Sequence, residues 1–305
     1  MLEPLVSIVI PCFNHGRFLR EALASVGSPA VPTEIIVIDD GSTDETADVI
    51  ATFETTNAFK SIRQQNAGIA AARNRGLRES RGRFVLFLDA DDRLAPGAVD
   101  IAAAALNAHP ECAFTFGRIQ FIDIDGSALP TPEQRRIVRD HYRELLRRNY
   151  ISVSAMVLFR RDALERIGGF NDDVSAASDY EVYLHIARHH PVHDHGQLVA
   201  QFRRHDRPAS FDAARLLRDT LAVIRSQRPF LEGDEASLVA YEDGWRSWQQ
   251  FYGEQLAGEV RSALREHRWA AALTRMMTLG RYYPRGLWQQ ARRPALAPMR
   301  VARRA

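Results

Sequence analysis

Three short polar segments each follow a predicted buried strand, and two of them are acidic. They are PCFN at residues 11–14, DDGS at 39–42 and DADD at 89–92. Ligands of open α/β sheets bind at the carboxyl ends of strands, so chemistry is expected at these positions. Carboxylates spaced Asp-x-Asp bind hard divalent ions such as Mg²⁺ or Mn²⁺, which would let an acidic edge hold an anionic diphosphate. The sequence contains no GxGxxG or Walker phosphate loop.

The elements that must position these segments alternate along the first half of the chain. Apolar runs predict strands at residues 5–10, 35–38 and 84–88. Helical periodicity predicts helices at 18–26 and 69–80 and another that begins at Pro96. A capping box at 42–45 predicts a helix that ends near Phe53. This alternation predicts a mostly parallel sheet flanked by helices.

The order of elements changes beyond residue 110. Strand-like runs occur at 113–124, 154–159 and 199–204. Helices are predicted at 131–149 and 178–189. From residue 209 onward the pattern is helical only, with breaks at Pro229, Gly233, Pro284 and Pro294. A helical extension is therefore expected after the α/β region.

The composition is that of a folded globular protein. Of 305 residues, 46% are hydrophobic and 26% are charged, which excludes the disordered and low-complexity classes. The two cysteines, Cys12 and Cys112, exclude a disulfide framework and a zinc site built from cysteines. No charged and apolar leader opens the chain, and no apolar run is long enough to span a bilayer. A soluble protein of the reducing cytoplasm is the expectation.

The charge is unevenly distributed along the chain. The formal net charge is only +2, but residues 267–305 contain nine arginines and no acid. The other 31 basic residues are outnumbered by 38 acidic ones, which gives residues 1–266 a net charge of −7. An acidic body with a basic tail argues against a nucleic-acid-binding protein.

Four motifs occur in order within the first 105 residues. They are VSIVIP at 6–11, IDDGSTD at 38–44, NAG at 66–68 with ARN at 72–74, and FLDADD at 87–92. Together they resemble the family 2 glycosyltransferases, which have the GT-A fold. The resemblance is close over residues 5–105 and looser to about 212. It implies a GT-A catalytic domain over 1–212, with a nucleotide-binding half at 1–110 and an acceptor-side half at 111–212. Residues 213–305 would form the helical extension.

The resemblance implies a sugar-nucleotide donor, usually a UDP-sugar, and inversion at the anomeric carbon. By position, Pro11 and Phe13 would line the nucleoside pocket, and Asp40 would accept a hydrogen bond from the base. Asp89 would contact the ribose or the donor sugar. Arg73 would lie near the phosphates or the sugar.

The resemblance also implies a metal site. Asp91 would ligate Mn²⁺ or Mg²⁺ bridging the diphosphate. The segment RRH at 203–205 and Ser210 resemble a stretch that closes over the diphosphate in relatives. His205 would be a metal ligand or a phosphate contact there, or else an ordinary polar residue.

An inverting transfer also needs a base that deprotonates the acceptor hydroxyl. The expected position lies in GGFN at 168–171 followed by SDYE at 178–181. The resemblance implies that Asp179 is this base. Family members commonly have Glu-Asp here, whereas this chain has Ser178 in place of the glutamate. The alternative is that Asp179 is only an acid at a helix N-terminus.

Several other residues have competing interpretations. Asp44 is expected to be a first-turn acid of a helix rather than a ligand, and Cys12 is expected to be structural. Asp39 fits a turn as well as a ligand, and Asp92 fits a cap as well as a ligand. Four histidines invite a zinc interpretation, although their helix-end and loop positions favour a solvated cluster: His189, His190, His193 and His195.

Two aromatic segments follow residue 212. The first recurs at helical spacing and predicts packing; it contains Trp245, Trp248, Phe251, Tyr252 and Leu256. The second combines arginines with large apolar residues, namely Trp269, Leu273, Met276, Met277, Leu279, Tyr282, Tyr283 and Trp288. It predicts either a peripheral contact with an anionic membrane, at its inner face, or a C-terminal helical cap.

The sequence thus predicts an inverting glycosyltransferase with a saccharide or lipid-linked hydroxyl acceptor, acting in surface polysaccharide or glycolipid assembly. One alternative is a catalytically silent sugar-nucleotide-binding or scaffold protein, which only Ser178 favours. Another is a sugar nucleotidyltransferase, which the lack of a glycine-rich, basic loop after the first strand disfavours.

Overall fold

The structure is a computed structural model that describes residues 3–54, 59–205 and 212–284. The chain forms two compact units. The first unit comprises Met1–Tyr142 and Tyr150–Asp206, and the second comprises Arg143–Asn149 and Arg207–Ala305. The domain division predicted at residue 212 stays a prediction.

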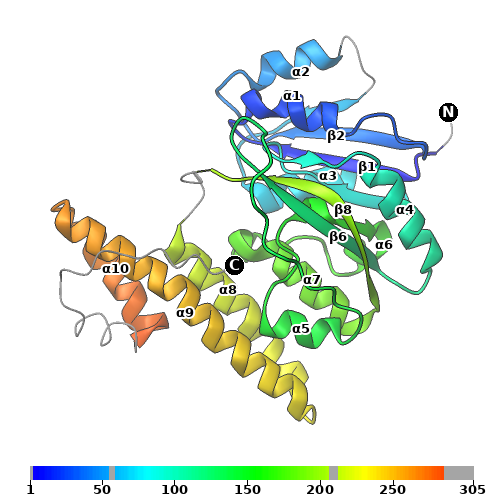
Figure 1. Ribbon diagram of the computed structural model, residues 1–305. Coiled ribbons are helices and arrows are strands. Elements are labelled where there is room, and N and C mark those ends of the chain that lie inside the picture. Colours follow the sequence, from blue (N-terminus) through cyan, green and yellow to red (C-terminus); the bar gives the residue numbers. More distant parts are fainter. Residues whose placement is uncertain (1–2, 55–58, 206–211, 285–305) are drawn as a thin grey trace. The chain divides into compact units, whose positions relative to one another are not determined.

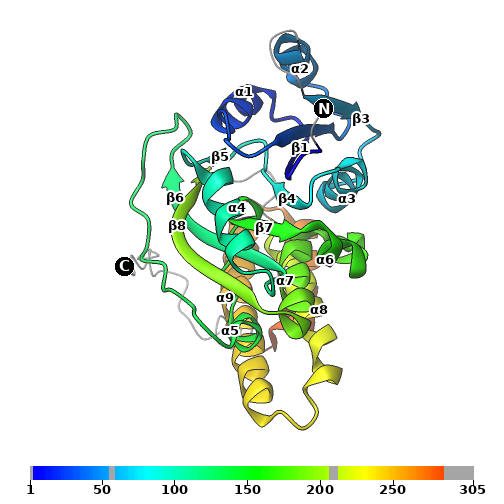
Figure 2. The same ribbon diagram turned by 90° about the vertical axis from the view of Figure 1, so that its right-hand side faces the viewer.

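A sheet of eight strands runs through the described residues of the first unit. The strands are β1 (Val6–Cys12), β2 (Thr33–Asp39), β3 (Lys60–Arg63), β4 (Phe84–Phe87), β5 (Arg93–Leu94), β6 (Phe114–Ile122), β7 (Val157–Arg160) and β8 (Val192–Arg203). Their order in the sheet is β3-β2-β1-β4-β7-β6-β8-β5, and the labels of Figures 1 and 2 together mark these strands.

The strand directions bring the acidic segments to one edge. Strands β1, β2, β3 and β4 pair in parallel, so the segments that follow β1, β2 and β4 share an edge of the sheet. β7 is antiparallel to both β4 and β6, which makes β6 parallel to β4. β8 pairs in parallel with β6, and the short β5 pairs antiparallel with β8. The predicted mostly parallel sheet is therefore confirmed.

Helices cover this sheet. They are α1 (Gly16–Ser25), α2 (Thr46–Glu54), α3 (Ile69–Glu79), α4 (Ala98–Ala108), α6 (Arg161–Arg166) and α7 (Ser178–His189), with short 3₁₀ turns at Ser154–Met156 and Asp172–Ala177. A further helix, α5 (His141–Arg147), has most of its residues in the second unit. α1 lies on one side of β1 and α3 lies on the other (Figures 1 and 2). Gly76 allows α3 to lie close to β1, because a Cβ there would be 2.1 Å from Cγ1 of Val9.

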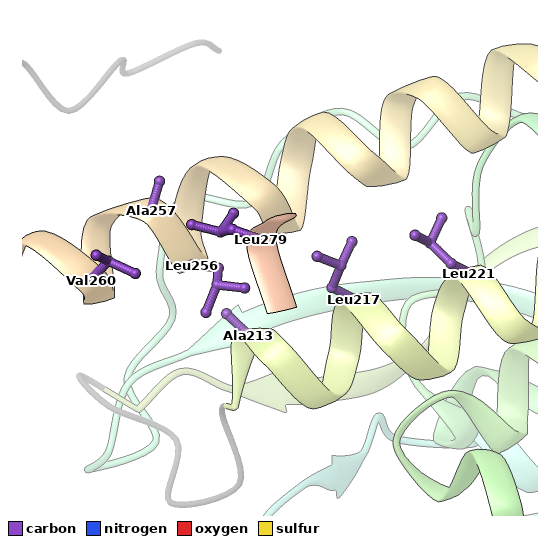
Figure 3. Close-up of a cluster of buried hydrophobic side chains, with 7 residues drawn as sticks. All are labelled: Ala213, Leu217, Leu221, Leu256, Ala257, Val260 and Leu279. Atoms are coloured by element: carbon purple, nitrogen blue, oxygen red, sulfur yellow. The ribbon is translucent and has the colours of Figure 1, made fainter. Parts of the chain in front are cut away.

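The second unit consists mainly of α8 (Ala213–Gln227), a 3₁₀ turn (Arg228–Leu231), α9 (Glu235–Arg265) and α10 (Trp269–Tyr282). Their shared core is shown in Figure 3 and contains Ala213, Leu217, Leu221, Leu256, Ala257, Val260 and Leu279. Trp245, Trp248 and Tyr252 pack against this core, as the helical spacing predicted, whereas Phe251 is 54% exposed. Within the described residues, no helix is both long and apolar enough to cross a bilayer.

Some local predictions were wrong. The strand predicted at 154–159 starts as a 3₁₀ turn at Ser154–Met156 and is a strand only from Val157. Residues 131–149 were predicted to be helical, but only His141–Arg147 form a helix. The preceding chain lies against β6, where the side-chain amide of Gln134 hydrogen-bonds both the N–H and the C=O of Ile119. The pairing satisfies the backbone groups of Ile119, which lies where the register between β6 and β8 is irregular. Side-chain hydrogen bonds to the backbone of this kind compete with helix formation.

The capping box predicted at residues 42–45 is also absent. The Ser42 hydroxyl accepts a hydrogen bond from the backbone N–H of Asn14 instead, and α2 begins at Thr46. The cap is supplied by Asp44, whose Oδ1 accepts from the N–H of Thr46 at 3.1 Å. Its Oδ2 accepts from the N–H of Gly16 at 2.9 Å, so one carboxylate fixes the first turns of α1 and α2. Asp44 therefore has the helix-terminus role that the sequence favoured.

Candidate active site

Asp89 follows β4 and forms an ion pair with Arg73 of α3. One guanidinium nitrogen of Arg73 lies 2.9 Å from Asp89 Oδ1 and 2.9 Å from the Ser154 hydroxyl. Burial acts to lower the pKa of Arg73, but the nearby charges of Asp89 and Asp179 outweigh it and raise the pKa. Arg73 is thus a buried, charged group that is bonded to the end of β4 and feels the charge of Asp179 at the start of α7.

Asp91 meets two imidazoles. Its Oδ2 lies 2.9 Å from Nε2 of His205 and 3.7 Å from Nδ1 of His15. The contact with His205 spans 114 positions of sequence and joins the end of β4 to the segment after β8. All three side chains are partly exposed, so a ligand can reach them from solvent.

The loop that carries Asp91 is held from behind by Arg203. This side chain is fully buried, and its Nε donates to the backbone carbonyl of Asp91 at 2.8 Å. Its Nη2 pairs with Glu21 at 2.5 Å, and its guanidinium lies 4.6 Å from the ring centre of Phe18. Because its donors are engaged inside the protein, Arg203 positions the Asp-x-Asp loop and is not free for a phosphate.

Asp92 is buried directly behind the loop. Its Oδ1 accepts from the backbone N–H of Arg203 at 2.9 Å, while its buried Oδ2 has no hydrogen-bond partner among the described residues. Burial, followed by the charges of Asp91 and Asp89, raises the pKa of Asp92 well above its usual range. The bond to Oδ1 favours the interpretation of Asp92 as a structural cap. The unpaired Oδ2 experiences the negative charges of Asp91 and Asp89.

The end of β2 is organised by two buried aspartates. Asp40 Oδ1 accepts from the N–H of Ala67 at 3.0 Å and from the side chain of Gln64, and Oδ2 accepts from the N–H of Gly68 at 2.9 Å. A carboxylate has about four acceptor positions, so these bonds leave one for the predicted contact with the base. Asp39 accepts from the N–H of Ser42 and pairs with Arg63 at 2.9 Å, which favours its interpretation as a turn residue.

The NAG motif therefore has a local explanation. Gly68 has a positive φ of 93° and precedes α3, a backbone conformation that side-chain-bearing residues rarely adopt. This turn directs the N–H groups of residues 67 and 68 at the Asp40 carboxylate.

The end of β1 provides an exposed aromatic ring. Pro11 is buried within the strand, whereas the side chain of Phe13 is 46% exposed and available for stacking. Cys12 is buried beside Thr46, and burial raises the pKa of its thiol to about 11. The Cys12 thiol is therefore protonated at neutral pH, as expected of a structural cysteine.

Asp179 lies in the first turn of α7. Its Oδ1 accepts from the N–H of Tyr180 at 2.7 Å, and the residue is partly exposed. Burial raises the pKa of Asp179, while the charge of Arg73 opposes the shift. Ser178 donates to the carbonyl of Ser175 and does not replace the missing glutamate. The carboxylate thus has a pKa moved toward that of a useful base.

The donor set at Asp91 fits a divalent cation. Adjacent ligands of an octahedral ion with bonds of about 2.1 Å lie about 3 Å apart, close to the 2.9 Å between Asp91 and His205. Protein sites for Mg²⁺ and similar ions commonly supply one or two side chains and leave the other positions to water and phosphate oxygens. The unpartnered Oδ2 of Asp92 beside this pair would gain from a nearby positive charge.

The histidine cluster suggested by the sequence does not form a ligand set in the described part of the chain. His189 and His190 line a surface hollow of about 340 Å³ with Arg166 and Arg188. Burial lowers the pKa of His195 to about 4.

Sequence reasoning missed three residues of the site. His15 approaches Asp91, and the Ser154 hydroxyl accepts a hydrogen bond from Arg73. The buried hydroxyl of Tyr183 has no hydrogen-bond partner in the described residues, and burial, followed by the charge of Asp179, raises its pKa well above the usual range. The HxxF sequence at 15–18, directly after the PCFN segment, was the only available signal for His15. Ser210 and Trp288 lie outside the described residues.

The topology and the acidic strand ends define a GT-A-type fold, and solved structures agree. TarS 1–349 of S. aureus, in complex with UDP, is similar with a TM-score of 0.59 and 18% identity, over 79% of this chain and 70% of that chain. Mannosyltransferase PcManGT from Pyrobaculum calidifontis, in complex with GDP-Man and Mn²⁺, is similar with a TM-score of 0.58 and 21% identity, over 95% of this chain and 85% of that chain. The predicted GT-A fold with a helical C-terminal region is confirmed.

The particular family follows from the sequence profile of Glycosyl transferase family 2, which matches residues 7–168. The chain belongs to this family, so the predicted family and the predicted enzyme class, a glycosyltransferase, are confirmed. Chondroitin synthase of Escherichia coli is 30% identical over 191 residues, which cover 60% of this chain and 26% of that protein. The putative teichuronic acid biosynthesis glycosyltransferase TuaG of Bacillus subtilis is 32% identical over 130 residues, which cover 42% of this chain and 51% of that protein. The chain thus spans less than two thirds of either relative.

Proposed function

We propose that this protein is an inverting glycosyltransferase that uses a nucleotide-diphosphate sugar and a hydroxyl acceptor. The observation that carries the proposal is the convergence, on one edge of the sheet, of the Asp91–His205 pair and the half-buried Arg73–Asp89 pair. Asp179 belongs to the same group, because its charge acts on Arg73. These residues can hold a diphosphate, a sugar and a base in one place.

Each group has a defined part in the proposal. Phe13 stacks on the nucleoside base, Asp40 accepts from it, and Asp89 hydrogen-bonds a sugar hydroxyl. Asp91 and His205 would hold Mn²⁺ or Mg²⁺, which when bound supplies positive charge to the leaving diphosphate. Asp179 accepts the proton of the acceptor hydroxyl as that oxygen attacks the anomeric carbon.

The donor and the acceptor follow from chemistry and from the relatives. UDP-sugars are the proposed donors, and TarS has been solved with UDP-GlcNAc, whereas PcManGT has been solved with GDP-Man. Relatives include a chondroitin synthase and a teichuronic acid glycosyltransferase, which supports a saccharide or lipid-linked acceptor in surface polysaccharide assembly. The predicted cytoplasmic location stays part of this proposal.

A thermal-shift screen of nucleotide sugars with and without Mn²⁺ tests the proposal. A ligand that binds only the native state stabilises it by mass action, by about 2.7 kcal/mol when its concentration is 100 times its Kd. This stabilisation raises the melting temperature. We expect a UDP-sugar to raise the melting temperature in the presence of Mn²⁺ more than a CDP-sugar does. Absence of any stabilising nucleotide sugar would contradict the proposal, and binding without hydrolysis or transfer would favour the catalytically silent alternative.

We further propose that α10 contacts an anionic membrane surface. Four large apolar side chains at positions i, i+4, i+7 and i+8 lie exposed on this helix: Trp269 (63%), Leu273 (59%), Met276 (40%) and Met277 (62%). Leu279 of the same helix packs into the core of the second unit. The helix α10 therefore has apolar side chains on its buried face and on its solvent-exposed face. An exposed apolar stripe of this kind typically marks an interaction surface.

The charge favours lipid as the occupant of this stripe. The segment 267–305 carries nine arginines and no acid, and each basic residue near an anionic surface contributes about 1 kcal/mol. The combination of an apolar stripe and basic residues is that of a helix lying in the membrane interface.

Co-sedimentation with vesicles is the test of membrane contact. Wild-type protein should bind vesicles that contain anionic lipid, bind neutral vesicles weakly, and dissociate as salt increases. The double variant Trp269→Ser/Met277→Ser should bind at least about tenfold more weakly, because a fully buried large apolar side chain contributes about 1.5–3 kcal/mol. Val239→Ser changes an exposed apolar residue of α9 and should bind like wild type. Point variants are preferable to truncation, since Leu279 belongs to the core.

Binding that ignores lipid charge and salt would contradict this proposal, and so would equal binding by the double variant. Either result would favour the helical cap as the role of the segment.

A further inference from the structure

A second group of metal-ligand side chains lies in the turn between α4 and β6. The ligand atoms of His109, Glu111 and Cys112 all lie within 4.8 Å of one another. Nδ1 of His109 is 3.2 Å from Oε1 of Glu111, and Sγ of Cys112 is 3.7 Å from the same oxygen. The thiol is buried, the imidazole is partly exposed and the carboxylate is exposed, so the group is open to solvent on one side.

The backbone of this turn is held in place without a ligand. The N–H of Cys112 donates to the carbonyl of His109 at 3.0 Å and closes the turn. The guanidinium of Arg160 in β7 donates to the carbonyls of Cys112 at 2.7 Å, Leu106 at 2.9 Å and His109 at 3.2 Å. Arg160 therefore fixes the two residues that carry the imidazole and the thiol, which lowers the cost of ordering them on binding.

A neighbouring strand fixes the imidazole as well. The ring of His193, at the start of β8, stacks on the ring of His109 with 3.8 Å between centroids and an interplanar angle of 27°. The backbone of His193 is itself tied to β6, since its carbonyl accepts from the Thr115 hydroxyl at 2.9 Å. The stacked ring restricts the orientation of His109.

This group is separate from the donor site. Because β6 and β8 run parallel to β4, the turn before β6 and the start of β8 lie at the amino ends of these strands. Asp89 and Asp91 follow the carboxyl end of β4, at the opposite edge of the sheet.

We propose that His109, Glu111 and Cys112 bind Zn²⁺. Tetrahedral zinc, with bonds of about 2.0–2.3 Å, places neighbouring ligand atoms about 3.3–3.8 Å apart. The 3.2 and 3.7 Å separations in the turn are close to those values. A set of one sulfur, one nitrogen and one oxygen selects zinc over Mg²⁺ and Mn²⁺, which prefer all-oxygen ligands.

Binding exchanges a proton for a metal bond. The Cys112 thiol releases its proton to solvent as the zinc–sulfur bond forms, and His109 and Glu111 supply lone pairs. A water occupies the fourth position. Zinc held in this way ties the end of α4 to the start of β6, so its expected effect is on the stability of the first unit rather than on sugar transfer.

Titration of the full chain with Co²⁺ tests this proposal, because thiolate bound to Co²⁺ gives a near-ultraviolet charge-transfer band. The Asp91–His205 pair contains no sulfur and cannot produce that band. Wild-type protein should develop the band up to one equivalent, and Zn²⁺ should abolish it by displacement. Cys112→Ser should remove the band, while the matched variant Cys12→Ala, which changes the other buried cysteine, should keep it.

Because Cys112 is buried, Cys112→Ser could lose metal binding by misfolding, so variants at the more exposed His109 and Glu111 provide an independent test. Loss of an outer-shell partner alone typically lowers metal affinity by about 10–100-fold, so His109→Gln and Glu111→Gln should each weaken Zn²⁺ binding by at least that factor. His189→Gln, an exposed histidine outside the group, should leave the affinity unchanged. The proposal is overturned if wild type gives no band, if Cys112→Ser retains it, or if Glu111→Gln binds Zn²⁺ like wild type.

Discussion

Asp179→Asn is expected to lower kcat by about 10²–10⁴-fold, the usual contribution of a general base, while the affinity for UDP changes little. Asparagine is nearly isosteric with aspartate but cannot accept the acceptor proton. Asp179 lies in the first turn of α7, within the electrostatic influence of Arg73 and Asp89. Initial-rate measurements on the preferred donor, with UDP binding measured separately, give both quantities.

The matched control is Asp173→Asn, which changes an exposed acid six positions earlier and should leave kcat unchanged. If Asp179→Asn retains turnover within about threefold of wild type, Asp179 is only an acid at a helix N-terminus and the base lies elsewhere.

The same residue predicts a pH dependence. A base must be ionised to accept a proton, and burial raises the pKa of Asp179 above that of an ordinary aspartate despite the opposing charge of Arg73. The kcat/KM of wild type should therefore be low in acid and rise as the pH passes through this raised pKa. The residual activity of Asp179→Asn should lack that acidic limb.

Asp91→Ala is expected to abolish most of the metal-dependent part of donor binding. Removing the carboxylate leaves His205 as a single side-chain ligand in the pair. Since loss of an outer-shell partner alone costs about 10–100-fold in metal affinity, loss of a ligand should weaken UDP binding in Mn²⁺ by at least that factor. Calorimetric titration with UDP, with and without Mn²⁺, measures the difference.

The protein should remain folded in this variant, because Asp91 is partly exposed and the loop is held through its backbone carbonyl by Arg203. Asp162→Ala, at an exposed acid of α6, is the control and should bind UDP in Mn²⁺ as wild type does. Unchanged Mn²⁺-dependent affinity in a folded Asp91→Ala protein would remove Asp91 from the metal site.

Strong local patterns explain why much of the fold could be predicted. The strands β1, β2 and β4 are built around short apolar runs rich in β-branched and aromatic residues. The helix α7 begins and ends at the predicted residues, 178 and 189. The strands β3 and β5 were missed because such a pattern is lacking: β3 is a partly exposed edge strand of four residues, and β5 has two. The start of β8 was missed because its first half contains His193, Asp194 and His195, which are polar.

The sequence by itself determined the class of the site. Acidic segments directly after parallel strands must share one edge of the sheet, because parallel strands end at the same edge, and this placed Asp40, Asp89 and Asp91 together before any contact was known. The motif spacing also identified the family. Both conclusions depend on residues that are near each other in sequence or on strand direction alone.

Only the tertiary structure decided which side chains meet. The pairing of Asp91 with His205, the approach of His15 and the buried position of Arg203 join segments that are far apart in sequence. Such contacts depend on the register of β8 against β5 and β6, which no local pattern specifies. The same reason explains the role of Arg203, which lies in a segment that resembles a diphosphate lid but supports the Asp-x-Asp loop from inside. Its position at the end of β8 brings its guanidinium to the backbone carbonyl of Asp91. Because the side chain is buried there, its donors must be satisfied by the chain itself.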